Sequence, residues 1–141
     1  MSDSPRISQD AAIVLALAET AIPFAHSHED EAERWVRVLR MHGQVGGVLQ
    51  ALGVSEAPLG TVAEKPGDRT PGRGRAVVAD VTAAACRFAV ARGAGLVGTV
   101  DVLFAVFDTY GGAFDRALYV RGATRDELIE RLAGEPGFKL I

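Results

Sequence analysis

Residues 95–107, "GLVGTVDVLFAVF", join a glycine-rich turn to a run that is apolar except for one carboxylate, Asp101. The run 100–107 is far shorter than the roughly 20 apolar residues that cross a bilayer, so it is not a membrane segment. We expect a core helix that Thr99 caps and that reaches about Thr109. Asp101 lies in its first turn, where the helix dipole favours a carboxylate.

Glycines punctuate the rest of this half of the chain. A long helix is expected over about 76–92, before the quoted stretch. After it, Gly111 and Gly112 break the chain, and a short helix over 113–121 stops at Gly122. Thr124 and Glu127 then have the spacing of a capping box, which predicts the start of a last helix.

The first half follows the same order. Ser8 is expected to cap a helix over 8–22, which Pro23 ends. A second helix runs from near Asp30 to Gly43, a third spans 44–52 and stops at Gly53, and Ser55 opens a short fourth.

Two segments show that the halves repeat. "VLQALGV" (48–54) and "ALYVRGA" (117–123) both close a helix with glycine, 69 positions apart. A glycine breaks the chain before each segment, Gly43 in the first half and Gly111 in the second. The number of residues from this break to the glycine that closes the helix differs by one between the halves. We predict one all-α domain over 1–141, with about eight helices in two four-helix units related by a pseudo-two-fold axis. The units span 8–63 and 76–133; an exposed linker (64–75, rich in Pro, Gly and charge) joins them, and 134–141 form a tail.

Composition narrows the class of protein. Of the 141 residues, 48% are hydrophobic and 6% aromatic, and Ala, Val and Leu are abundant, which favours packed helices. The net charge of −3 gives no basis for nucleic-acid binding. The lone Cys86 forms no internal disulfide, and the first residues lack the order of a signal peptide, so we expect a cytoplasmic protein without a membrane partner.

The order of these features resembles the Clp amino-terminal repeat, the double four-helix domain at the front of ClpA- and ClpC-type unfoldases. The resemblance rests on "LVGT" (96–99), the apolar helix after it and Gly122, and in the first unit on "VLALA" (14–18) and "LQALGV" (49–54). It covers about residues 8–133. Each motif is weak alone; their order and duplication carry the resemblance.

The resemblance implies a non-catalytic binding role. Clp amino-terminal domains dock substrates and adaptors for the attached motor, near the starts of the long helices, and those of ClpC type recognise phosphorylated arginine. This chain has no G-x-x-x-x-G-K-[ST] phosphate loop, so we expect no ATP hydrolysis, no enzyme activity and no cofactor. Candidate partners are substrates or adaptors of the Clp protease system, for which the chain would compete with the ClpC amino-terminal domain. The alternative is a protein that sequesters Clp-targeting cyclic peptides or other small molecules. A fragment of a longer unfoldase is a third reading.

The chain departs from the family at the ligand-binding glutamate that follows "GT". Val100 stands at that position and Asp101 follows it, rotated by about 100° around the helix. Valine cannot bind a guanidinium group, which argues against phosphoarginine in the second unit. In the first unit, counting back from Gly53 gives Glu31, and the apolar pattern gives Ala32 or Glu33. The tentative partner-binding residues are therefore Glu31, Glu33, Val100 and Asp101.

Other candidate chemistry is weaker. His26 and His28 lack a third spaced ligand for zinc, so no metal site is expected. The acidic residues 30–33 fit either a solvated helix start or a contact with a basic partner. Cys86, among alanines, fits a buried inert thiol. Phe104, Phe107 and Tyr110 recur at helical spacing and are expected to pack in the core.

Overall fold

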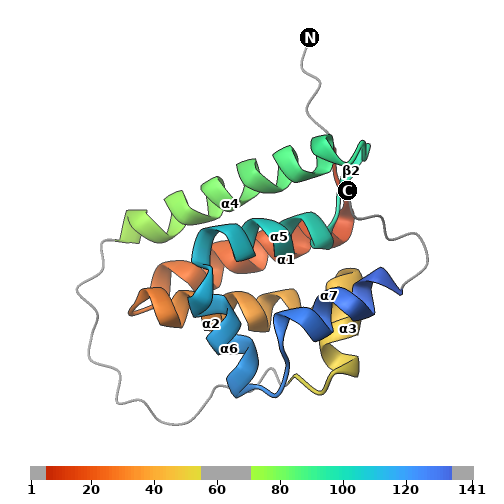
Figure 1. Ribbon diagram of the computed structural model, residues 1–141. Coiled ribbons are helices and arrows are strands. Elements are labelled where there is room, and N and C mark those ends of the chain that lie inside the picture. The colour runs from red at the N-terminus through yellow and green to blue at the C-terminus, as the bar shows by residue number, and fades with distance from the viewer. Residues whose placement is uncertain (1–5, 55–70, 135–141) are drawn as a thin grey trace.

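The structure, a computed structural model, describes residues 6–54 and 71–134, and this part is all-α apart from two short strands (Figure 1). Its α-helices are α1 (Gln9–Ala21), α2 (His28–Leu39), α3 (Gly43–Ala51), α4 (Pro71–Ala91), α5 (Thr99–Tyr110), α6 (Gly112–Val120) and α7 (Arg125–Ala133). A 3-10 turn, η1 (Ile22–Phe24), follows α1. The strands β1 (Arg6–Ile7) and β2 (Leu96–Val97) form a parallel pair.

Side chains cap several of these helices as the sequence predicts. The Ser8 hydroxyl accepts a hydrogen bond from the Ala11 N–H (3.1 Å) at the start of α1. At the start of α7 the predicted capping box is confirmed, because Thr124 and Glu127 accept each other's backbone N–H groups. The expectation that Thr99 caps α5 is wrong. Gly98 is the N-cap, and the Thr99 hydroxyl accepts a bond from another helix instead.

The glycines repeat in conformation as well as in position. Gly53 after α3 and Gly122 after α6 have φ of 83° and 92°. At both ends the next residue donates to a carbonyl five positions back, from Val54 to Leu49 (3.0 Å) and from Ala123 to Leu118 (3.1 Å). This is the Schellman motif, which requires a left-handed residue and so favours glycine. The two units therefore end their short helices in the same way.

The two units pack on each other reciprocally. Helix α2 contacts α6, and its counterpart α5 contacts α3; α1 contacts its counterpart α4, and α2 contacts α5. In Figure 1, α4, α5 and α1 run alongside one another, with α2, α3, α6 and α7 below them. This arrangement is what an approximate two-fold relation between the units requires.

The core lies between the units. Trp35 of α2 is fully buried, and its indole N–H donates to the Tyr110 hydroxyl of α5 (2.9 Å). The expected core role of the α5 aromatics is confirmed, since Phe107 and Tyr110 are buried and Phe104 packs against the core. Phe107 also meets Phe114 of α6 edge-on, with ring centroids 5.3 Å apart. Cys86 is only half-buried.

Some boundaries differ from the expectation. Helix α4 begins at Pro71, inside the segment expected to be a linker to residue 75. Proline suits the first position of a helix because its fixed φ is helical and no N–H is needed there. The linker residues 64–70, the helix expected at Ser55 and the tail after Gly134 lie outside the described residues. No helix in the described part is both long and apolar enough to cross a membrane.

Candidate functional site

The parallel strand pair brings the starts of two helices together. Arg6 pairs with Leu96 and Ile7 with Val97, and the Ser8 N–H donates to the Val97 carbonyl (2.9 Å). The residue that directly follows each strand is the N-cap of a helix, Ser8 for α1 and Gly98 for α5. Because the strands are parallel and in register, α1 and α5 begin side by side.

A third helix, α3, begins at the same place. Its first residue, Gly43, has φ of 81°, and a Cβ there would lie 2.6 Å from the Thr99 Cγ2 atom and 2.8 Å from its Oγ1. The Val45 N–H points at the Thr99 hydroxyl oxygen (3.4 Å). Only glycine fits this position, for reasons of conformation and of space.

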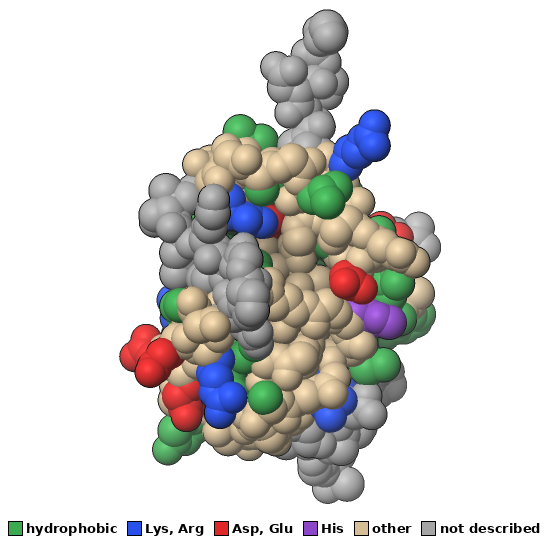
Figure 2. All heavy atoms as spheres, turned by 90° about the vertical axis from the view of Figure 1, so that its right-hand side faces the viewer, with side chains coloured by type: hydrophobic (Ala, Val, Ile, Leu, Met, Phe, Trp, Pro, Cys, Tyr) green, Lys and Arg blue, Asp and Glu red, His purple; other side chains and the backbone are tan. Residues whose placement is uncertain are grey.

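These helix starts surround a hollow of about 240 Å³. It is lined by Ser8, Asp10, Gln44, Arg92, Gly98, Thr99 and Val100. Figure 2 views this end of the molecule, and its middle is largely backbone and uncharged polar side chains, with acidic, basic and histidine side chains around it. We call this feature the N-terminal hollow.

An ion pair closes one wall of the N-terminal hollow. Arg92, just after α4, donates from Nε and Nη2 to the two carboxylate oxygens of Asp101 (2.7 and 2.6 Å). The Gly98 N–H donates to the same carboxylate (2.9 Å). Asp101 is fully buried, and its hydrogen bond to Arg92 raises the pKa of the arginine. The positive charge of Arg92 is thus largely neutralised within the protein by Asp101.

What remains for a ligand is uncharged polar backbone and side chains together with one exposed carboxylate, that of Asp10. The first turns of three helices direct N–H groups and positive dipole ends toward this end of the molecule. Asp10 is exposed at the rim, and Gln44 is exposed beside it. The lining residues include no histidine, cysteine or lysine that could activate the Ser8 hydroxyl, which already caps α1.

The structure separates the four residues singled out from the sequence. Val100 lines the N-terminal hollow but is only 5% exposed, and Asp101 lies behind it in the ion pair. Glu31 is fully buried on α2 and accepts a hydrogen bond from the Tyr110 hydroxyl (2.8 Å). Tyr110 ends α5, about 14 Å along the helix axis from Asp101. Glu33 pairs with Arg121 (3.0 Å) after α6.

The helix starts also fix the register that the sequence left open. Ser27 is the N-cap of α2 as Gly98 is of α5, so Glu29 occupies the position of Val100, and Asp30 that of Asp101. Counting back from Gly53 gave Glu31 because the first unit has three extra residues, 40–42, between its second helix and Gly43. The stretch from Gly43 to Gly53 is one residue shorter than the corresponding stretch from Gly111 to Gly122, so the net error in this count is two residues.

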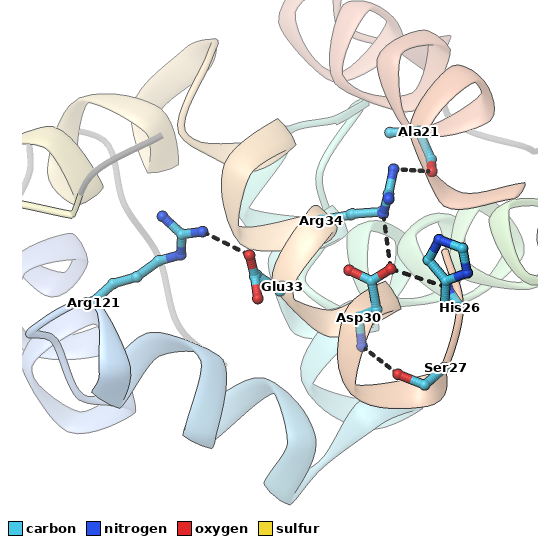
Figure 3. Close-up of polar contacts among 7 residues, drawn as sticks. All are labelled: Ala21, His26, Ser27, Asp30, Glu33, Arg34 and Arg121. Carbon is cyan, nitrogen blue, oxygen red and sulfur yellow. Dashed lines mark hydrogen bonds and ion pairs between the residues drawn. The ribbon is translucent and has the colours of Figure 1, made fainter. Parts of the chain in front are cut away.

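In the first unit, both carboxylates at the helix start face arginines of this chain. Glu29 accepts from Arg116 of α6 (2.8 Å), and this hydrogen bond lowers the pKa of the Glu29 carboxyl. Asp30 accepts from the His26 backbone N–H (2.9 Å) and pairs with Arg34 (3.3 Å), as Figure 3 shows. Sequence reasoning missed Glu29. The signal that could have found it is an N-cap residue followed three residues later by aspartate, Ser27 with Asp30 and Gly98 with Asp101. Aligning these two pairs places Glu29 at the position of Val100.

In the part of the chain that the structure describes, no three His, Cys, Asp or Glu side chains cluster in a way that could hold a metal ion. His28 instead packs its ring against Tyr110, with centroids 5.0 Å apart. No family model matches the chain, and no curated protein matches it significantly.

Proposed function

We propose that this chain is a non-catalytic protein-binding module of the Clp amino-terminal type. It captures substrates, adaptors or ligands of the Clp protease system, or competes for them with the ClpC amino-terminal domain. The observation that carries the proposal is the repetition of helices α1–α3 in α4–α6, with left-handed glycines at corresponding breaks and ends. The sequence resemblance predicts this duplication.

The N-terminal hollow is the binding site in this proposal. It lies at the starts of α1, α3 and α5, and it presents polar backbone around a small concave surface. Such sites orient a ligand with a few convergent polar groups.

The ligand preference differs from that of the family. In the second unit Val100 offers no carboxylate, and Asp101 is already held by Arg92. In the first unit the equivalent carboxylate, Glu29, is held by Arg116, an exposed pair that a competing guanidinium group can displace at low cost. Because Val100 has no carboxylate and Arg92 holds Asp101, we expect no selective binding of phosphoarginine at the N-terminal hollow. Glu29 does not line this hollow, and its displaceable pair makes the start of α2 the place where the first unit would bind such a ligand. A titration of a phosphoarginine peptide beside its unmodified control tests this.

An affinity capture experiment tests the proposal. The immobilised chain is compared with Gln44→Trp, which places a bulky ring at the exposed rim of the hollow, and with Gln50→Trp at the other end of α3. We expect Clp unfoldase components, adaptors or proteolytic substrates on the wild type and on Gln50→Trp, and much less on Gln44→Trp. Capture of none of these by the wild type would count against the proposal. Thermal unfolding of all three checks that they are folded.

A further inference from the structure

A second concave surface lies between α6 and the start of α7. Its volume is about 590 Å³, within the roughly 300–1,000 Å³ of typical ligand sites. Its charged lining residues are Asp115, Arg116, Arg125 and Asp126, and Tyr119 and Val120 supply its apolar part. None of the residues that line it also lines the N-terminal hollow, so this is a separate surface. We call this feature the α6–α7 groove.

Two exposed hydrophobic side chains stand next to each other at the end of α6. Tyr119 is 75% exposed and Val120 is 61% exposed, and both line the α6–α7 groove. Tyrosine is among the residues that contribute most to binding at protein interfaces. An exposed aromatic ring also offers its π face to a cation. The apolar part of the groove therefore suits a long side chain that ends in a positive charge.

The arginines of the α6–α7 groove are already neutralised by carboxylates of this chain. Arg116 pairs with Glu29 of α2 (2.8 Å), and Arg125 pairs with Asp115 (2.8 Å). Arg125 also lies over the Phe107 ring, 4.5 Å from its centroid. These two pairs leave no net positive charge for a ligand.

The carboxylates of α7 are not balanced in this way. Asp126 is exposed, and no ion pair or hydrogen bond within the described residues engages its carboxylate. Glu127 accepts from the N–H and hydroxyl groups of Thr124, which are neutral and leave its charge in place. Glu130 is exposed one turn after Asp126, and Arg131 offsets one of the three carboxylates. The positive end of the helix dipole offsets about half a charge more, so this side of the groove remains negative.

We propose that the α6–α7 groove docks a segment of a partner protein through a basic side chain, lysine or arginine. The cation lies against the exposed ring of Tyr119 and faces Asp126, and its methylene stem covers Val120. The free carboxylate and the aromatic face are independent features that select the same chemical group, and the negative charge of α7 disfavours acidic segments. This inference goes beyond the proposed function, because it uses another surface and does not depend on the Clp system.

An NMR titration of the 15N-labelled chain with two peptides tests the proposal, one of alternating serine and lysine, the other with glutamate in place of lysine. We expect the lysine peptide to shift the backbone amide signals of Tyr119, Val120 and Asp126, and to bind more weakly as salt rises. The glutamate peptide should leave these signals unchanged. The spectra of the free variants below also show whether each one is folded.

Asp126→Asn should weaken binding of the lysine peptide by about threefold or more. The matched control is Asp10→Asn, the same change at an exposed aspartate that is likewise the second residue of its helix, α1. It should leave the affinity of the α6–α7 groove unchanged.

A second pair of variants tests the aromatic contact. Tyr119→Ala should weaken binding of the lysine peptide by about threefold or more, whereas Tyr119→Phe keeps the π face and should bind like the wild type. The proposal is overturned if the two peptides bind alike, if the lysine peptide leaves the signals of the groove unchanged, or if folded Asp126→Asn and Asp10→Asn behave alike. Equal binding by folded Tyr119→Ala and the wild type would overturn it as well.

Discussion

Asp101 is the residue on which the N-terminal hollow depends most. Its carboxylate accepts two bonds from Arg92 and one from the Gly98 N–H, so it ties the end of α4 to the start of α5. The sequence predicts a carboxylate that is favoured by the helix dipole. It does not predict the arginine, because Arg92 lies nine residues earlier, across a glycine turn whose direction no local pattern determines.

We expect Asp101→Asn to destabilise the protein by about 3 kcal/mol, because it removes the charge of a fully buried carboxylate and leaves the half-buried Arg92 guanidinium without its charged partner. Urea unfolding monitored by circular dichroism measures this. The control is Asp108→Asn on the exposed side of the same helix, which should change stability by less than about 0.5 kcal/mol. Equal effects of the two substitutions would refute the structural role of the ion pair.

Glu29 provides a pH prediction. Its hydrogen bond to Arg116 lowers the pKa of the carboxyl in the folded state, so the pair contributes stability above the ordinary glutamate range. That contribution is lost as the pH falls through the lowered pKa. An NMR titration of the Glu29 side chain should show a pKa below that of ordinary glutamates, and Arg116→Gln should raise it. An unchanged pKa in the variant would show that Arg116 is not the cause.

At the scale of elements, two of the contacts between helices of different units involve buried side chains. One is the hydrogen-bond chain from Trp35 through Tyr110 to Glu31, which links α2 to α5. The other is the close approach of α3 to the first turn of α5 at Gly43. The sequence predicts the helices themselves well, because capping residues and glycines mark their ends. It does not predict these contacts, which join residues 75 and 79 positions apart in the first case.

Tyr110→Phe removes only the hydroxyl of this chain and leaves the ring in place. We expect a loss of about 2 kcal/mol, because the bond to the fully buried Glu31 and the bond from the Trp35 N–H both disappear. Tyr119→Phe on α6 is the control, since Tyr119 is 75% exposed. Chemical unfolding followed by tryptophan fluorescence measures both. A loss no larger than that of the control would mean that the buried bonds contribute nothing net.

Comparing Gly43→Ala with Gly111→Ala separates the free-energy cost of steric crowding from the cost of an unfavourable backbone conformation. Both glycines have positive φ, but a Cβ at Gly111 meets open space, whereas one at Gly43 meets Thr99. We expect about 1 kcal/mol of destabilisation for Gly111→Ala and at least about 2 kcal/mol for Gly43→Ala. Combining Gly43→Ala with Thr99→Ala should cost less than the two changes summed. Additive costs in thermal unfolding would show that the two residues do not clash.

At the scale of the whole molecule, the repeat is what the sequence predicts best. Two glycine-ended segments 69 positions apart indicate the duplication, and Gly53 and Gly122 share a positive φ at the corresponding helix ends. The candidate site is predicted less well. Of its lining residues only Val100 was singled out, because the others come together through a strand pairing between residues 6–7 and 96–97. Two-residue strands leave no periodic signal in a sequence.

The central claim is that the N-terminal hollow binds partners of the Clp system. Its most direct test is the degradation of an adaptor-dependent substrate by a purified ClpC-type protease, with this chain added in excess. We predict that the wild type and Gln50→Trp slow degradation, whereas Gln44→Trp leaves the rate near that without the chain. An unchanged rate with the wild type, or equal slowing by the folded Gln44→Trp variant, would contradict the claim.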